Sequence, residues 1–220
     1  MVADDLSLPL SAAQRAALER RAVRRTFARG QALCHQGQVS DRVMILLGGR
    51  VKVTSTTRHG REVVLAFRGP GDLVGELSAL DGAPRSASVV ALEPVEVLAL
   101  APDDFTGFLA EHPAVVAALL ALLSRRLRDG DVKRIEFAAY DTLGRVAIRL
   151  LELCERFGEA SGDRVDVLLP LSQEELAGWA GASLESATRA LQTMRSLGWI
   201  ETSRRRIRVL DMAALRRAVG

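Results

Sequence analysis

The sequence predicts an α+β fold with an N-terminal jelly roll (a double-stranded β-helix), one long helix and a C-terminal winged helix-turn-helix. Three observations support this prediction. Between residues 23 and 100, glycine and proline interrupt short apolar runs about every 8 to 12 residues. From residue 113, apolar side chains recur at helical spacing. Between residues 172 and 210, a capped helix, a glycine turn, a second capped helix and a hairpin follow one another. We expect a β-roll domain at residues 1–110, the long helix at residues 111–137 and a winged helix-turn-helix domain at residues 138–220.

Length and composition fit a globular protein of two domains. The chain has 220 residues, of which 48% are hydrophobic and 26% charged, and this composition excludes wholesale disorder. The net charge of +3 is small, so any nucleic-acid binding must depend on local charge placement. No stretch approaches the roughly 18 to 20 apolar residues of a membrane helix. Acidic Asp4 and Asp5 do not suit a signal peptide, and we expect a cytoplasmic protein without membrane contact.

Cysteine and histidine placement argues against a resident metal or redox centre. Cys34 and Cys154 lie far apart in the sequence, which excludes a disulfide framework and a four-thiolate site supplied by one chain. We expect both thiols to behave as small buried hydrophobes. His35, His59 and His112 occur in loop or turn contexts, where solvated histidines far outnumber haem ligands. We therefore expect no metal, no haem and no iron–sulfur cluster.

Catalytic motifs are missing from the sequence as well. It has no recognisable Ser/His/Asp set, no H-x-x-x-H spacing and no Gly-x-x-x-x-Gly-Lys phosphate loop. These absences argue against an enzyme.

The first domain is expected to begin with a short amphipathic helix and continue as a β-roll. Ser11 caps a helix to about Arg20, whose buried side is expected to comprise Ala16, Ala17 and Leu18. Short strands with intervening turn residues are typical of a double-sheet roll. The expected strands include Val43–Leu47, Val51–Thr54, Val63–Phe67, Ser88–Leu92 and Val95–Leu100, with a hairpin tip at Arg58–Arg61.

A single long helix follows the β-roll. Pro113 stands in its first turn, where the missing N–H has no consequence. The apolar positions with helical spacing are Val116, Leu119, Leu120, Leu123, Leu127, Ile135 and Phe137. A helix of this length between two compact units usually pairs, most simply with the same helix of a second subunit. The alternative is that this helix packs only against its own domain and does not pair with a second subunit.

The last stretch has the element order of a winged helix-turn-helix. A helix begins at Asp141 and ends near Phe157, and a small strand pair is expected within 165–170. Ser172 and Glu175 form a capping box at the start of the next helix. The remaining expected features are a tight turn at Gly181-Ala182, a helix from Ser183 to about Leu197, and a hairpin from Glu201 to Leu210.

One candidate binding site lies between two of the predicted strands. Gly75 would let the backbone approach a ligand, and a short helix opening there would aim N–H groups at an anion. Arg85 and Ser86 supply a guanidinium and a hydroxyl suited to phosphate oxygens, while Glu76 can accept from a sugar hydroxyl. Each residue alone is a weak signal, but together they are specific. The candidate residues are Gly75, Glu76, Leu77, Ser78, Arg85 and Ser86.

These motifs resemble those of the cyclic-AMP receptor protein and fumarate–nitrate regulator family of bacterial transcription factors, over essentially the whole chain. The resemblance implies a homodimer formed through helix 111–137, an effector pocket in the β-roll, double-stranded DNA as ligand and RNA polymerase as partner. It also implies cyclic AMP as allosteric effector, with Glu76 on the ribose and Arg85 and Ser86 on the cyclic phosphate. The matching segments are Gly71–Leu77, Pro84–Ala87, Asp141–Ala147, Leu171–Ala177 and Gly181–Arg189.

The long helix departs from the family's pattern at the base-binding position. Where the cyclic-AMP receptor has a Thr-Ser pair that reaches the adenine, this chain has Gly130-Asp131. A carboxylate at Asp131 can accept from adenine's amino group, which favours cyclic AMP over cyclic GMP. A merely solvated Asp131 is the alternative, as is a relative that answers another signal or has lost its ligand.

The second helix of the motif is expected to read DNA. Leu184 replaces an arginine that is frequent in cyclic-AMP receptors and can offer only apolar contact, for example to a thymine methyl. Glu185 can accept from cytosine, and Arg189 can donate to guanine or a phosphate. Arginines at the hairpin tip would hold phosphates. The candidate residues are Ser172, Ser183, Leu184, Glu185, Thr188, Arg189, Arg204, Arg205 and Arg206.

Overall fold

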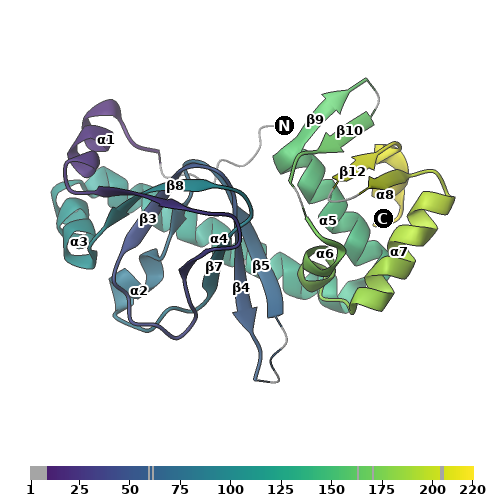
Figure 1. Ribbon diagram of the computed structural model, residues 1–220, viewed down its shortest axis with the longest axis horizontal. Coiled ribbons are helices and arrows are strands. Elements are labelled where there is room, and N and C mark those ends of the chain that lie inside the picture. Colours follow the sequence, from purple (N-terminus) through teal and green to yellow (C-terminus); the bar gives the residue numbers. More distant parts are fainter. Residues whose placement is uncertain (1–8, 59, 61, 163, 170, 204–205) are drawn as a thin grey trace. The chain divides into compact units, whose positions relative to one another are not determined.

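The computed structural model describes residues 9–58, 60, 62–162, 164–169, 171–203 and 206–220. The described residues form two compact units that meet between Asp129 and Gly130, so the boundary falls inside the long helix (Figure 1). The α+β fold class, with its β-roll, long helix and C-terminal helix-turn-helix, is confirmed. Five residues named in these expectations lie outside the described residues, so what was expected of them stays a prediction: His59, Arg61, Pro170, Arg204 and Arg205.

The N-terminal unit is a roll of two four-stranded antiparallel sheets. One sheet has the order β1-β8-β3-β6 and the other β2-β7-β4-β5. The strands are β1 (Val23–Phe27), β2 (Ala32–Cys34), β3 (Val43–Gly48), β4 (Val51–Thr56), β5 (Glu62–Arg68), β6 (Leu73–Val74), β7 (Ser88–Ala91) and β8 (Val95–Leu100). The helices are α1 (Ala12–Glu19), α2 (Glu76–Asp81), α3 (Pro102–Glu111) and α4 (Pro113–Ala139), the last running on into the second unit.

Two apolar clusters form the core of this unit. One comprises Met44, Leu46, Val51, Val89, Val97 and their neighbours from both sheets. The other joins Leu18 of α1 to Phe105 and Phe108 of α3 and to Leu119 and Leu122 of α4. Full burial of each large apolar side chain stabilises the fold by roughly 1.5–3 kcal/mol. The expected buried side of α1 was partly wrong, because Ala16 is exposed and Leu18 alone is fully buried.

The C-terminal unit combines helices with a four-stranded sheet of order β11-β12-β10-β9. Its elements are α5 (Thr142–Phe157), β9 (Gly158–Ser161), β10 (Arg164–Val167), α6 (Gln173–Trp179), α7 (Leu184–Ser196), β11 (Ile200–Ser203), β12 (Arg206–Val209) and α8 (Met212–Arg217). The strand pair expected within 165–170 lies earlier in the chain, because α5 passes directly into β9. Gly158 permits this change of direction, since a side chain there would collide with the Cys154 carbonyl and Val165.

Local capping and one glycine turn define the helix-turn-helix. Ser172 and Glu175 form the expected capping box, and the Ser183 hydroxyl accepts from the Ser186 amide at 3.1 Å. Gly181 has a φ of 60°, in the left-handed region that favours glycine. A side chain at Gly181 would also overlap the ring of Phe137. The turn between α6 and α7 therefore depends on glycine for both its backbone conformation and its packing.

Candidate functional site

The candidate effector site is built around the start of α2. Gly75 is the N-cap residue of this helix and has a φ of 83°. A Cβ at Gly75 would overlap the guanidinium of Arg85 and approach the Arg42 carbonyl oxygen to 3.1 Å. The glycine therefore supplies a left-handed backbone conformation and leaves room for Arg85 to lie against the start of the helix.

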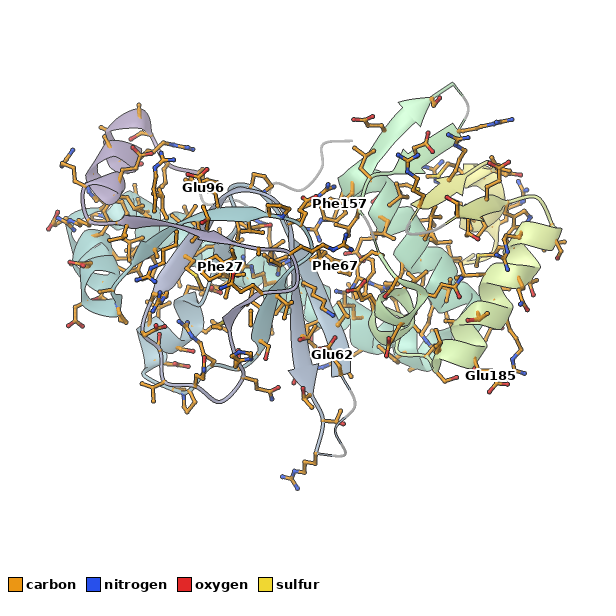
Figure 2. The ribbon with its side chains drawn as sticks, in the orientation of Figure 1. Phe27, Glu62, Phe67, Glu96, Phe157 and Glu185 are labelled. Atoms are coloured by element: carbon orange, nitrogen blue, oxygen red, sulfur yellow. The ribbon has the colours of Figure 1, made fainter. Side chains whose placement is uncertain are left out.

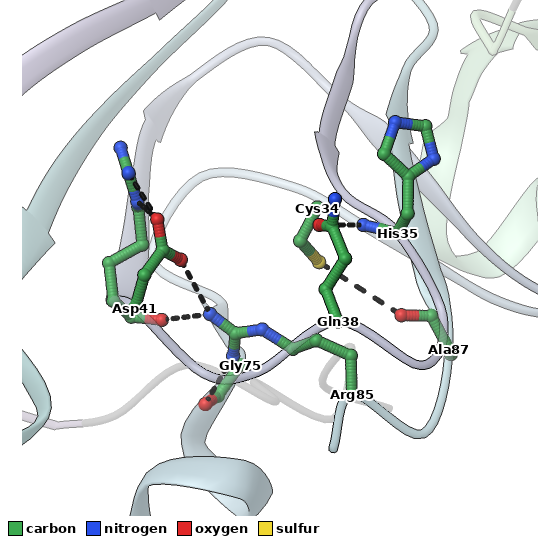
Figure 3. A network of polar contacts seen from close by, with 8 residues as sticks. Cys34, His35, Gln38, Asp41, Gly75, Arg85 and Ala87 are labelled. Carbon is green, nitrogen blue, oxygen red and sulfur yellow. Dashed lines mark hydrogen bonds and ion pairs between the residues drawn. The ribbon is translucent and has the colours of Figure 1, made fainter.

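Arg85 is a buried cation with an incomplete set of partners (Figure 3). Only 3% of the residue is exposed. Its Nη1 donates to the Gly75 carbonyl at 2.8 Å, while its Nη2 donates to the Arg42 carbonyl and lies 3.4 Å from Asp41 Oδ1. Among the described residues, none accepts a hydrogen bond from Arg85 Nε. Because burying a charge without full hydrogen bonding is costly, this guanidinium is suited to receive an anion.

Asp41 is the acidic neighbour of Arg85. Its Oδ2 accepts from Arg42 Nε at 2.7 Å, and more than half of its side chain is exposed. The hydrogen bonds from Arg42 hold the pKa of Asp41 below its ordinary value, and the charge of Arg85 adds a smaller effect in the same direction. Asp41 is therefore ionised at neutral pH and balances part of the local positive charge.

Glu76 is also buried, and it is paired with Arg126, a residue outside the predicted site. Arg126 of α4 donates from Nη1 to Glu76 Oε1 at 2.7 Å and from Nη2 to the Leu73 carbonyl at 2.8 Å. Arg126 continues the helical spacing of the buried residues Leu119 and Leu122. A charged residue in line with a buried apolar stripe was the signal that could have identified it.

The remaining predicted effector residues occupy varied environments. Ser78 is buried, whereas Leu77 and Ser86 are exposed. Asp131 pairs with Arg134 at 3.1 Å on an exposed surface. Apart from its chain neighbours and the nearby backbone of α4, no atom of the described residues lies within 4 Å of a Cβ built on Gly130. The structure thus brings Gly75, Glu76 and Arg85 to the start of α2, and the base-binding role of Gly130 and Asp131 stays a prediction.

In the C-terminal unit, α7 presents charged side chains to solvent. Glu185 and Arg189 form an ion pair of 3.0 Å, with side chains 80% and 68% exposed. Figure 2 shows Glu185 projecting outward from α7. Leu184 is also exposed, in the first turn of the same helix. These positions leave the start of the helix accessible to a macromolecular surface.

The surface between α6 and the hairpin contains a cleft of about 190 Å³. Polar residues on its lining include Ser172, Gln173, Ser203 and Arg206. Thr188, in contrast, donates its hydroxyl to Gln173 Oε1 at 3.1 Å and so connects α7 to α6. This arrangement gives Thr188 a structural contact within the motif.

A metal site and a membrane-spanning helix are the two other features considered for the described residues. No group of three or more His, Cys, Asp or Glu side chains there is arranged to hold a metal ion. No single described helix has the length and apolar composition to cross a membrane. Helices α3 and α4 pass that test only as a pair, and the chain bends by 114° between them.

The two thiols are predicted to be unreactive in the folded protein. Cys34 and Cys154 are both free and buried, as expected. Burial raises the pKa of Cys34 and raises the pKa of Cys154 to about 12, so both remain thiols rather than reactive thiolates at pH 8. Iodoacetamide should label native protein much more slowly than urea-unfolded protein, as measured by mass spectrometry. Equal labelling rates in the two states would contradict this prediction.

Comparison with known families assigns both units. Residues 24–112 match the cyclic nucleotide-binding domain family, and residues 144–218 match the Crp-like helix-turn-helix domain family. The CRP-like cAMP-activated global transcriptional regulator of Mycobacterium tuberculosis (strain ATCC 25618 / H37Rv) is 35% identical over 191 residues, which cover 87% of this chain and 85% of the relative. The cyclic AMP receptor protein of Thermus thermophilus is 33% identical over 192 residues, covering 87% and 86%.

Solved structures agree on the fold. The c-di-GMP responsive global regulator CLP of Xanthomonas campestris matches with a TM-score of 0.82 at 21% identity, covering 91% of this chain and 100% of that one. A CRP-family transcriptional regulator from Thermus thermophilus matches with a TM-score of 0.76 at 27% identity, covering 89% and 96%. The chain therefore belongs to the cyclic-AMP receptor protein and fumarate–nitrate regulator (CRP/FNR) family, whose members are DNA-binding transcription regulators and not enzymes.

Proposed function

We propose that this transcription regulator is a homodimer whose DNA binding is controlled by cyclic AMP bound in the β-roll. The observation that carries the effector proposal is the buried Arg85 guanidinium, whose Nε has no acceptor among the described residues. A cyclic phosphate would supply the missing acceptor through a charge-assisted hydrogen bond. The buried Glu76 carboxylate, also at the start of α2, would accept from the ribose hydroxyl.

The same site suggests how the effector would act on the long helix. Glu76 is bonded to Arg126, so a ribose hydroxyl that reaches Glu76 also alters the surroundings of α4. A ligand shifts a conformational equilibrium only through contacts that differ between the two states. We propose the Glu76–Arg126 pair as such a contact, because a ribose hydroxyl that donates to Glu76 would compete with Arg126 for the carboxylate oxygens.

Titration calorimetry tests the effector. We expect both cyclic AMP and cyclic GMP to produce heat on binding, with cyclic AMP binding more tightly because the Asp131 carboxylate can accept from adenine's amino group. If neither cyclic AMP nor cyclic GMP produces heat at millimolar concentration, the result would contradict nucleotide control. The function would then be DNA-binding regulation under another signal, or with a vestigial pocket.

Dimerisation is proposed through α4. Leu120 and Leu127 are 60% and 66% exposed, and the partly buried Val116 and Leu123 complete their spacing of alternating three and four residues. This spacing is that of a coiled-coil seam. Gly130 is the next position in the series, where a residue without a side chain permits close approach of a second helix. A second copy of the chain is therefore the proposed occupant, and RNA polymerase is the proposed partner on promoter DNA.

Operator reading is proposed for the first turns of α7. Arg189→Ala and Glu185→Ala should each relax base preference and cost roughly 1–3 kcal/mol on the best site, because each removes a base contact. Selection from random duplexes should recover an inverted repeat with half-sites about one helical turn apart. Arg206→Ala is the control, because loss of a phosphate contact should weaken all sequences alike. A selected site without twofold symmetry would contradict the proposed dimer.

A further inference from the structure

One face of α7 carries a third polar side chain besides the ion-paired Glu185 and Arg189. At 3.6 residues per turn, Gln192 lies only about 20° around the helix from Glu185 and about 60° from Arg189. All three residues are exposed. The opposite side of the helix is buried through Ala187, Ala190, Leu191 and Met194. Gln192 is therefore near the middle of the solvent-facing surface, whereas Leu184 lies about 100° away from Glu185.

The amide of Gln192 is available for a ligand. Within the described residues, Gln192 makes no side-chain hydrogen bond, whereas Glu185 and Arg189 are bonded to each other. Ser196 and Thr188 are also polar and lie near this face, but the Ser196 hydroxyl donates to the Thr193 carbonyl and the Thr188 hydroxyl donates to Gln173 of α6. An exposed amide between engaged neighbours retains its full capacity to donate and accept.

The three side chains differ in hydrogen-bonding character. A carboxylate only accepts, a guanidinium only donates, and an amide does both. In the major groove, adenine presents an acceptor at N7 and a donor at its amino group, which together match the amide of glutamine. We propose that Gln192 is a specificity-determining residue that reads an adenine in each half of the operator.

Helix geometry limits where this adenine can lie. At a rise of about 1.5 Å per residue, Gln192 stands about 10 Å along the helix from Glu185. With base pairs about 3.4 Å apart, that distance corresponds to about three base-pair steps in the groove. The adenine is therefore expected within three base pairs of the position that Glu185 contacts. The proposal rests on the family's DNA binding and not on the identity of the effector.

The test is selection of random duplexes by the full chain at low salt, with and without cyclic AMP. Wild type, Gln192→Ala and Thr193→Ala are compared, where Thr193 is the adjacent exposed residue on α7. Gln192→Ala should reduce adenine preference about tenfold at one position per half-site and leave the other positions unchanged. Thr193→Ala should give the wild-type site. An unchanged selected site for Gln192→Ala would overturn the proposal.

A second measurement separates base reading from a phosphate contact. Replacing the selected adenine by 7-deazaadenine removes the N7 acceptor, and this should weaken wild-type binding while hardly affecting Gln192→Ala. If Gln192→Ala instead weakens every sequence alike, Gln192 contacts the backbone and the proposal is wrong. Equal losses for both proteins on 7-deazaadenine DNA would lead to the same conclusion.

Discussion

An Arg85→Leu variant is expected to bind cyclic AMP about 10- to 100-fold more weakly than wild type. The substitution removes the buried guanidinium whose Nε has no acceptor among the described residues. Loss of a charge-assisted hydrogen bond to phosphate costs about 1.5–3 kcal/mol, which corresponds to this change in affinity. Titration calorimetry measures the loss directly, and DNA binding in the presence of cyclic AMP should fall in parallel.

A matched surface variant separates this effect from a change in net charge or stability. Arg29→Leu makes the same substitution at an exposed position of the same unit, and it should bind cyclic AMP as wild type does. Arg85 also donates to the Gly75 and Arg42 carbonyls, so thermal melting of Arg85→Leu is needed to establish that the β-roll remains folded. Wild-type affinity in a folded Arg85→Leu protein would contradict the proposed phosphate contact.

A double variant, Leu120→Glu with Leu127→Glu, is expected to be monomeric and to bind its operator at least about 100-fold more weakly. Both leucines are exposed in the single chain, so the substitutions should not disturb the fold of the protomer. In a dimer they would place like charges in an apolar seam, which is strongly unfavourable. Loss of the second half-site contact then removes the avidity of two linked DNA-binding domains, which is worth about 100-fold or more.

The neighbouring exposed positions provide the control for this double variant. Ala121→Glu with Arg128→Gln lowers the net charge equally and keeps the spacing of seven residues, but the changes lie about 100° around the helix. This control should remain dimeric in sedimentation-equilibrium experiments and retain operator affinity. A dimeric Leu120→Glu/Leu127→Glu protein would show that α4 does not form the interface.

Local interactions explain why the helix-turn-helix could be predicted from the sequence. The caps at Ser172 and Ser183 join residues three apart, and the turn at Gly181 depends on the backbone freedom of one residue. Such features can be recognised within a short stretch of sequence, as can the periodicities of strands and helices. They determined the α+β class, the long helix and the order of elements.

Strand β9 shows where local pattern was insufficient. Gly158–Ser161 is largely exposed and lacks alternating apolar residues, so nothing in it favours a strand in isolation. Pairing with β10 defines it, with Glu159 opposite Asp166 and Ser161 opposite Arg164. An exposed strand of this kind exists because its backbone groups find partners, and those partners are known only from the folded sheet.

The sequence was enough to predict an anion and sugar site, because the chemical types and short spacing of its residues are local properties. The pairing of these residues, in contrast, follows from contacts between distant parts of the chain. Arg126 meets Glu76 from 50 positions away, and Asp41 meets Arg85 from 44 positions away. Such ion pairs depend on the packing of α4 and of the loop before β3 against the start of α2. No local pattern encodes that packing, because buried charges find partners through the fold as a whole.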